Sequence, residues 1–192
     1  MPQTTDKRIM KTQEKLFQAY IQVLQSEDPN DITIQRLTKL AQVNRMTFYN
    51  RYQHLANFHE QFMQHYVEQL YSYLKNVNYE AFKEGDELHK LVQLFKHIHK
   101  HQDIYRILFT APTSMPFSQY MIKYFQQKAD MKTADIASFS FPGTDVDKEI
   151  VVWYGMSALI GTIHMWIQSN FVYSPEVLAT SYAKLSTNLR EA

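Results

Sequence analysis

The chain has 192 residues, 45% of them hydrophobic, which is enough to bury a substantial core in one or two domains. It contains no cysteine, and this excludes disulfides and zinc sites built on thiolates. The first 17 residues lack the apolar segment of a signal peptide, so we expect a cytoplasmic protein.

The formal net charge of +1 is unevenly divided along the chain. Residues 1–54 carry eight basic and five acidic side chains, a net charge of +3, and residues 55–192 carry twelve and fourteen, a net charge of −2. A solvated surface can produce so mild a difference by chance. If the protein binds a polyanion, the N-terminal segment is the part expected to bind it.

Apolar residues at helical spacing predict a first helix over residues 7–25, with Ile9 on its apolar face. A second helix is predicted to end at Ala41 and to begin after Thr33, a good N-cap because its hydroxyl can accept a hydrogen bond from a free N–H. A turn then leads to another N-cap residue, Asn44, and to a short third helix.

The rest of the chain predicts only helices. They are expected at about 54–77, 86–101, 103–110, 117–131, 145–171 and 175–190, and the clearest loop is Lys132–Asp145. No convincing strand is present, and only 4 glycines and 6 prolines interrupt the chain. We therefore predict an all-α fold.

The third helix, Arg45–Tyr52, is unusually short and polar for a core helix. Phe48 and Tyr52 share one face and can close a small core, whereas the opposite face presents polar side chains. A helix, a tight turn and a second helix with exposed polar residues describe a helix-turn-helix, whose second helix enters the major groove of DNA. The alternative is an ordinary packing helix with a polar outer face.

Residues 8–62 contain a set of residues whose types and spacing match the pattern of one protein family. These residues are Lys11, Thr12, Leu16, Phe17, Ile32, Thr33, Ala41, Val43, Asn44, Thr47, Phe48, Tyr49, Tyr52, Phe58 and Phe62. Through them the segment resembles the N-terminal DNA-binding domain of the tetracycline-repressor (TetR) family of bacterial transcriptional regulators. Two positions depart from the family pattern, because Gln42 replaces a turn glycine that favours φ > 0, and Leu55 replaces a lysine.

The resemblance implies a helix-turn-helix DNA-binding domain (1–54) with its connecting helix (about 54–77), and a helical-bundle domain for effector binding and dimerisation (78–192). The resemblance places Arg45, Met46, Thr47 and Asn50 toward the bases, where an arginine matches guanine and an asparagine matches adenine. Phosphate contacts are expected from Thr33, Tyr49, His54, Lys7 and Arg8.

The C-terminal half resembles the family in broad form, and two segments (97–109 and 153–179) resemble a subgroup that contains regulators of dihydroxyacetone utilisation. Its many aromatic residues suit an apolar pocket for a small-molecule effector, although core packing is the simpler explanation. The candidate pocket residues are Phe95, Tyr105, Phe109, Tyr120, Tyr124, Trp153 and His164.

Residues 150–172 contain no charged side chain, and this length would span a membrane. Their polar residues and the absence of flanking anchors favour instead a helix buried in a core or a subunit interface. With the helix that follows, they predict a homodimer interface formed by Gly155, Ala158, Gly161, Leu178, Tyr182 and Leu185.

His97 and His101 lie on one helix face, but no carboxylate or cysteine completes a metal site, so we predict none. No nucleophile elbow or phosphate loop is present, and we expect neither catalysis nor a cofactor. With the family resemblance, we expect a repressor that an effector releases from a palindromic double-stranded DNA operator. The alternative is a protein of the same fold that acts mainly through a protein partner, with weak or architectural DNA binding.

Overall fold

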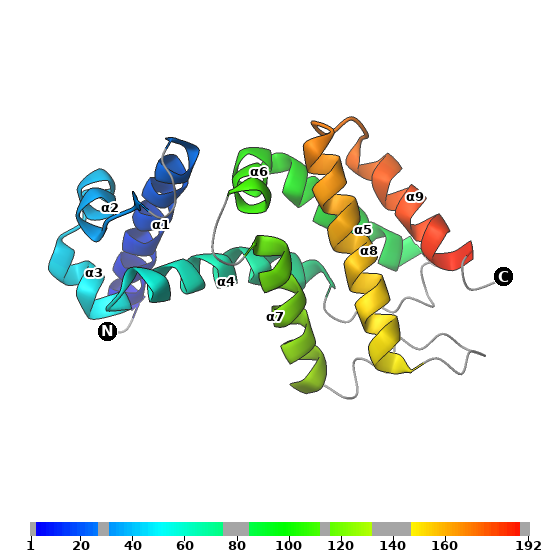
Figure 1. Ribbon diagram of the computed structural model, residues 1–192, viewed down its shortest axis with the longest axis horizontal. Coiled ribbons are helices and arrows are strands. Elements are labelled where there is room, and N and C mark those ends of the chain that lie inside the picture. Colours follow the sequence, from blue (N-terminus) through cyan, green and yellow to red (C-terminus); the bar gives the residue numbers. More distant parts are fainter. Residues whose placement is uncertain (1–2, 27–30, 75–84, 112–115, 132–146, 189–192) are drawn as a thin grey trace. The chain divides into compact units, whose positions relative to one another are not determined.

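The computed structural model describes residues 3–26, 31–74, 85–111, 116–131 and 147–188. These residues form helices and no strand, which confirms the predicted all-α fold (Figure 1). The helices are α1 (Gln3–Ser26), α2 (Ile34–Ala41), α3 (Arg45–Tyr52), α4 (Leu55–Leu74), α5 (Gly85–Lys100), α6 (Gln102–Thr110), α7 (Phe117–Met131), α8 (Lys148–Gln168) and α9 (Pro175–Asn188). The loop predicted at 132–145 lies outside the described residues, as do the predicted helix ends near 77 and 190.

The chain divides into two compact units, and the division falls inside α4. The first unit comprises Met1–Tyr66 and Thr110–Pro116, and the second comprises Val67–Phe109 and Phe117–Ala192. Within the first unit α1 packs against α2, and α2 packs against α3 (Figure 1). The domain boundaries expected at residues 54 and 77 stay a prediction.

The core of the first unit is built largely from aromatic rings. The Phe17 ring of α1 lies 5.6 Å from Phe58 and 5.2 Å from Phe62, both on α4, and each contact is edge to face. Tyr52 of α3 lies 4.9 Å from Phe58 at an interplanar angle of 89°. Such pairs contribute about 0.5–1.5 kcal/mol each beyond the burial of their area, so they hold α1 and α3 against α4.

The buried stripe of α1 begins later than the sequence predicts. Ile9 was expected on the apolar face but is 44% exposed, whereas Leu16 and Phe17 are buried. The carbonyl oxygen of Ile9 instead accepts a hydrogen bond from the guanidinium of Arg51. At this end of α1, the contact with α3 is therefore polar.

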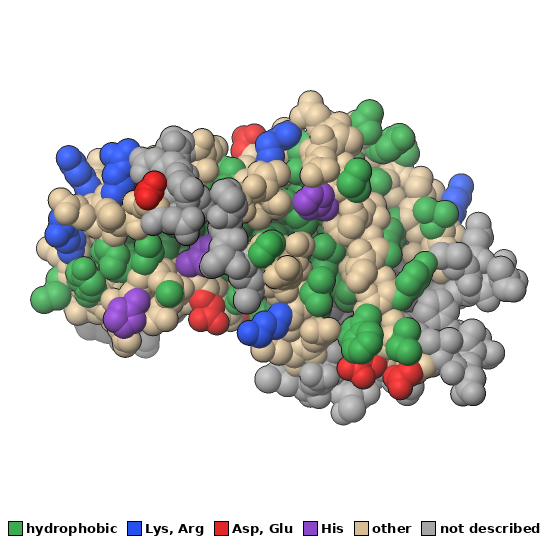
Figure 2. All heavy atoms as spheres, viewed as in Figure 1, with side chains coloured by type: hydrophobic (Ala, Val, Ile, Leu, Met, Phe, Trp, Pro, Cys, Tyr) green, Lys and Arg blue, Asp and Glu red, His purple; other side chains and the backbone are tan. Residues whose placement is uncertain are grey.

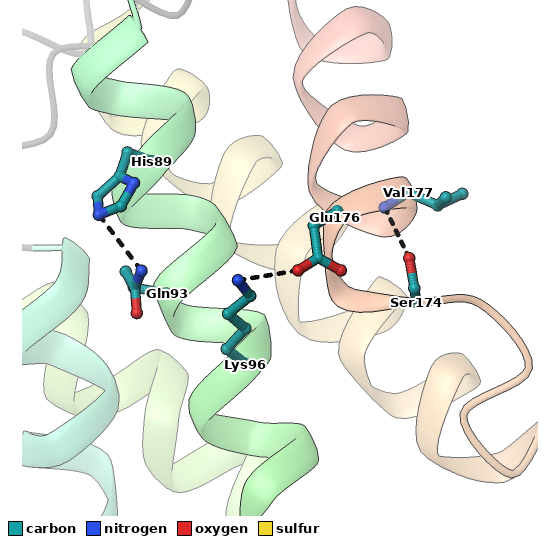
Figure 3. A network of polar contacts seen from close by, with 6 residues as sticks. All are labelled: His89, Gln93, Lys96, Ser174, Glu176 and Val177. Carbon is teal, nitrogen blue, oxygen red and sulfur yellow. Dashed lines mark hydrogen bonds and ion pairs between the residues drawn. The ribbon is translucent and has the colours of Figure 1, made fainter.

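Within the second unit α5 packs along α9, and α7 contacts α8. The Lys96 ammonium of α5 lies 2.9 Å from the Glu176 carboxylate in the first turn of α9, and the Ser174 hydroxyl accepts a hydrogen bond from the Val177 N–H (Figure 3). Because Lys96 and Glu176 are both half-exposed, this ion pair contributes little stability. Burial of apolar side chains, such as Phe95 against Trp166, contributes more.

Helix α8 is shorter than the predicted span of 145–171. It begins at Lys148, where the Asp147 carboxylate accepts a hydrogen bond from the Glu149 N–H at 2.9 Å. It ends at Gln168 because Asn170 and Phe171 adopt left-handed backbone conformations, with φ of 59° and 58°. Among the described residues, no helix is both long enough and apolar enough to cross a membrane.

Candidate functional site

Helices α2 and α3 and the turn between them have the geometry of a helix-turn-helix. Gln42 ends α2 in the left-handed conformation, with φ 53° and ψ 44°. The next N–H, of Val43, donates to the Thr38 carbonyl oxygen at 3.0 Å. This conformation costs a residue with a side chain about 1 kcal/mol. The turn therefore keeps the backbone that the missing glycine would adopt.

Two N-cap side chains fix the starts of the two helices. The Thr33 hydroxyl accepts a hydrogen bond from the Arg36 N–H at 3.2 Å, and the Asn44 side-chain oxygen accepts one from the Met46 N–H at 2.8 Å. Each cap stabilises its helix by about 1 kcal/mol. A hydroxyl that accepts can still donate, so the N-cap role of Thr33 is compatible with the expected phosphate contact.

The outer face of α3 holds the predicted DNA-contacting side chains. Phe48 and Tyr52 are buried, and they turn the opposite side of the helix to solvent. Lys and Arg side chains gather over α2 and α3 in the view of Figure 2. The exposed residues of α3 are Arg45, Met46, Thr47, Tyr49 and Asn50.

Arg51 is a residue that sequence reasoning missed. One terminal nitrogen of its guanidinium donates to the Ile9 carbonyl oxygen at 3.1 Å, and the other donates to the Gln13 side-chain oxygen at 2.7 Å. Arg51 therefore holds α3 against α1. The available signal was its position about 60° around the helix from the buried Phe48, away from Arg45.

The remaining predicted phosphate contacts, Lys7, Arg8 and His54, are all exposed. His54 follows Gln53, which has φ 63° and ψ −51°, and the His54 N–H donates to the Tyr52 carbonyl oxygen at 2.6 Å. These angles describe a γ-turn with positive φ, which is rare and strained. The turn sets the direction in which the chain leaves α3, and nothing in the sequence predicted it.

The predicted effector residues of α5 and α6 lie in packed surroundings. Phe95 and Tyr105 are fully buried, and the Tyr105 hydroxyl lies 2.9 Å from His97 Nε2. Phe109 lies 5.8 Å from the ring of His164. The His164 ring also forms a hydrogen bond with the Gln168 side chain at 2.8 Å.

Among the predicted effector residues of α7 and α8, Trp153 lines a small cavity. Tyr120 and Tyr124 are on α7, and the Tyr124 hydroxyl donates to Glu68 at 3.4 Å. Burial and the Glu68 charge raise the pKa of Tyr124 to about 12. The cavity has a volume of about 140 Å³, below the roughly 300–1,000 Å³ of typical ligand pockets. It is lined by Ile122, Gln126, Trp153, Met156 and Ser157.

His97 is the strongly perturbed histidine of the second unit. Its ring lies 4.8 Å from the ring of His101, the residue that follows α5. Burial lowers the pKa of His97 to about 4, and the nearby His101 and Lys100 charges add to this effect. The side chain is therefore neutral at pH 7. Within the described ranges, no three His, Cys, Asp or Glu residues are grouped to hold a metal.

The predicted dimer residues differ in their exposure within one protomer. Gly161 and Leu185 are exposed, Gly155, Ala158 and Leu178 are intermediate, and Tyr182 is buried, with its hydroxyl donating to the Gly155 carbonyl oxygen at 3.1 Å. A Cβ atom added at Gly155 or Gly161 would meet nothing within 4 Å. Figure 2 shows hydrophobic side chains on the surface over the N-terminal half of α8. The large apolar residues exposed on α8 and α9 are Ile150, Trp153, Tyr154, Met165, Val177 and Leu185.

The all-helical fold and the exposed face of α3 define a helix-turn-helix protein with a separate helical unit. A family model described as the transcriptional regulator C-terminal region, TetR_C_8, matches residues 86–188, more than half of the chain. The chain belongs to the TetR family of transcriptional regulators. No curated protein sequence shows a significant match to it.

Solved structures with a similar fold cover nearly the whole chain. A TetR transcriptional regulator from Streptococcus agalactiae 2603V has 22% identity and a TM-score of 0.64, over 97% of this chain and 99% of that one. NalD, the secondary repressor of the MexAB-OprM efflux pump in Pseudomonas aeruginosa, has 15% identity and a TM-score of 0.63, over 95% and 96%. The dihydroxyacetone kinase operon activator DhaS has 18% identity and a TM-score of 0.62, over 94% and 96%.

Proposed function

We propose that this protein is a cytoplasmic, homodimeric repressor that binds a palindromic DNA operator through α3. The observation that carries the proposal is the exposed face of α3. Five side chains point to solvent there, and two buried aromatic residues hold the helix in place. An uncovered, hydrogen-bonding helix after a tight turn suits the major groove of DNA.

The exposed side chains divide into two roles in this proposal. Arg45 and Asn50 pair with base edges, because a guanidinium matches guanine and an amide matches adenine. Met46 and Thr47 face the bases as well. The expected phosphate contacts fix the register of the helix on the duplex without reading sequence, and they come from Thr33, Tyr49, His54, Lys7 and Arg8.

Dimerisation is proposed to occur through α8 and α9. Their exposed apolar residues need cover, and the two small residues Gly155 and Gly161 leave open space for another helix. A two-fold pair of these helices would form a four-helix interface, in which each patch meets its own copy. Two copies of α3 would then meet the two half-sites of a palindrome.

Release is proposed to follow from a small molecule that binds the C-terminal unit. A ligand shifts the protein toward whichever state it binds more tightly, and it lowers operator affinity if that state spaces the two α3 helices wrongly. The proposed binding site of this molecule lies among the aromatic residues predicted for the pocket and at the cavity beside Trp153. Among proteins of this fold, NalD is named a repressor and DhaS an activator, so a reporter assay must test the direction of control.

Selection of binding sites from a random duplex library tests the proposal. The wild type should enrich a palindrome, and its affinity should fall as salt rises, because phosphate contacts release counterions. Arg45→Ala or Asn50→Ala should each cost about 1–3 kcal/mol at particular positions, whereas Tyr49→Phe should weaken all sequences equally. Failure to enrich any sequence would favour the alternative, a regulator that acts mainly through a protein partner.

A further inference from the structure

Met46 is an aliphatic side chain on a binding face whose other members all carry hydrogen-bonding groups. It is 66% exposed, and it is the second residue of α3. Its backbone N–H already donates to the Asn44 side chain at 2.8 Å. Only the thioether side chain of Met46 is therefore left to contact a ligand.

The chemistry of the major groove restricts what such a side chain can contact. Base edges there present donors and acceptors, together with one aliphatic group, the C5 methyl of thymine. A thioether is at best a weak acceptor, so Met46 placed against a polar edge would remove water from that edge without replacing its hydrogen bonds. Against a thymine methyl it would bury apolar surface, and its unbranched, flexible chain can adjust to reach that group.

We propose that Met46 is a specificity-determining residue that reads the methyl group of a thymine in each operator half-site. The inference rests on the proposed function and assigns a base to one position of the recognition surface. Thr47, its exposed neighbour, also carries a methyl group and must be tested separately.

The experiment replaces thymine by uracil, which pairs identically and lacks only the methyl group. Each thymine of the selected operator is replaced in turn, symmetrically in both half-sites, and the affinity of the wild-type protein is measured. Loss of one methyl contact should weaken binding roughly fourfold, or roughly 15-fold for the symmetric pair. The loss should occur at one thymine pair that Met46 contacts.

Two variants assign that loss to a side chain. Met46→Gln keeps the length of the side chain and makes it polar, so it should bind the thymine and uracil forms of that pair equally. Thr47→Ser removes the other methyl and keeps the hydroxyl, so it should retain the wild-type loss. Both positions are exposed, and circular dichroism should show unchanged folding.

Four results would overturn the inference alone. The affinity of the wild type is unchanged by every uracil replacement, or the Met46→Gln variant loses as much affinity as the wild type. Otherwise the affinity loss disappears in the Thr47→Ser variant, or the selected operator contains no thymine. In each of these cases the wild type still binds its unmodified operator, so the proposed function survives. A wild type that selects no sequence overturns both.

Discussion

Helices α3 and α8 both leave a face uncovered, and the chemistry of the two faces is opposite. The eight-residue α3 exposes Arg45 and Asn50, groups that form bidentate hydrogen bonds. The 21-residue α8 exposes large apolar side chains, including Tyr154 and Met165. The exposed face of α3 suits a hydrated, charged partner. The exposed face of α8 suits an apolar partner surface of similar composition, from which water is excluded. The comparison suggests a different kind of partner for each unit.

The two helices are also supported differently. In α3, buried rings, an N-cap and the Arg51 bonds hold a helix that is too short to be stable alone. In α8, apolar residues occur on most sides, so the protomer buries some and leaves others exposed. Mutations of the exposed residues of α3 should therefore change DNA recognition without unfolding the protein. Mutations of the exposed residues of α8 should change the oligomeric state.

The largest effect is expected from a charge on the exposed side of α8. Gly161→Asp adds a side chain where one protomer has open space, so the protomer should still fold. If the dimer covers this position, each uncompensated buried charge costs about 3–5 kcal/mol. Sedimentation equilibrium should then show monomers, and the protein should lose tight operator binding.

The matched control is Gly161→Ala, which adds volume without charge and should remain dimeric. Circular dichroism of both variants would verify that the helices persist. A Gly161→Asp protein that sediments as a dimer would remove this part of α8 from the interface.

The two arginines of α3 provide the next test. Arg51→Ala removes two hydrogen bonds to α1, and bonds made by charged groups contribute about 1.5–3 kcal/mol each, less where they are exposed. Urea unfolding should show a loss of roughly 1–3 kcal/mol, and binding should weaken for all sequences alike. Arg45→Ala, six residues earlier on the same helix, should leave stability unchanged and alter base preference. Equal stability losses in the two variants would contradict the role of Arg51 in holding α3 against α1.

A third prediction concerns acid stability of the second unit, away from the exposed faces. The pKa of His97 is about 4 in the folded protein and 6.5 in an unfolded chain. Between these values the unfolded state binds more protons, so stability must fall as the pH drops from 6.5 toward 4. His97→Gln cannot titrate and can still bond to Tyr105. The variant should lose less stability than the wild type between pH 7 and pH 5 in urea unfolding.

His89→Gln is the control for this measurement, because His89 is exposed and its hydrogen bond is to Gln93 on the same helix (Figure 3). It should retain the acid sensitivity of the wild type. If His97→Gln shows the same acid sensitivity as His89→Gln, the neutral state of His97 does not contribute to stability.

Local signals were sufficient to predict most helices, and the errors have two causes: contacts between distant residues, and positive-φ conformations at residues other than glycine. The Thr33 and Asn44 caps lie beside the helices that they start, so the sequence locates them. Arg51, by contrast, bonds to residues 38 and 42 positions earlier, a pairing that helical periodicity cannot reveal. The end of α8 was missed because Asn170 and Phe171 adopt positive φ without a glycine.

The two predicted sites, the DNA-contacting face of α3 and the effector pocket, also differ in how far local signals predict them. The outer face of α3 follows from the spacing of its two buried aromatic residues, and the structure exposes all five expected side chains. The residues predicted for the effector pocket share only their aromatic type, and aromatic residues line pockets and fill cores alike. Trp153 lines the cavity, whereas Phe95 packs against Trp166.

The smallest effect is expected at the turn that positions α3. Gln42→Gly places glycine where φ is 53°, and it removes a steric cost of about 1 kcal/mol, although part of this gain is lost to the greater freedom of glycine in the unfolded chain. The Gln42 N–H still donates to the Lys39 carbonyl oxygen, so the cap of α2 is unaffected. Urea unfolding should show a gain of a few tenths of a kcal/mol up to about 1 kcal/mol, with base preference unchanged. Gln42→Ala keeps the steric cost and should show no gain. A glycine variant that is less stable than the alanine variant would mean that the glutamine side chain itself stabilises the turn.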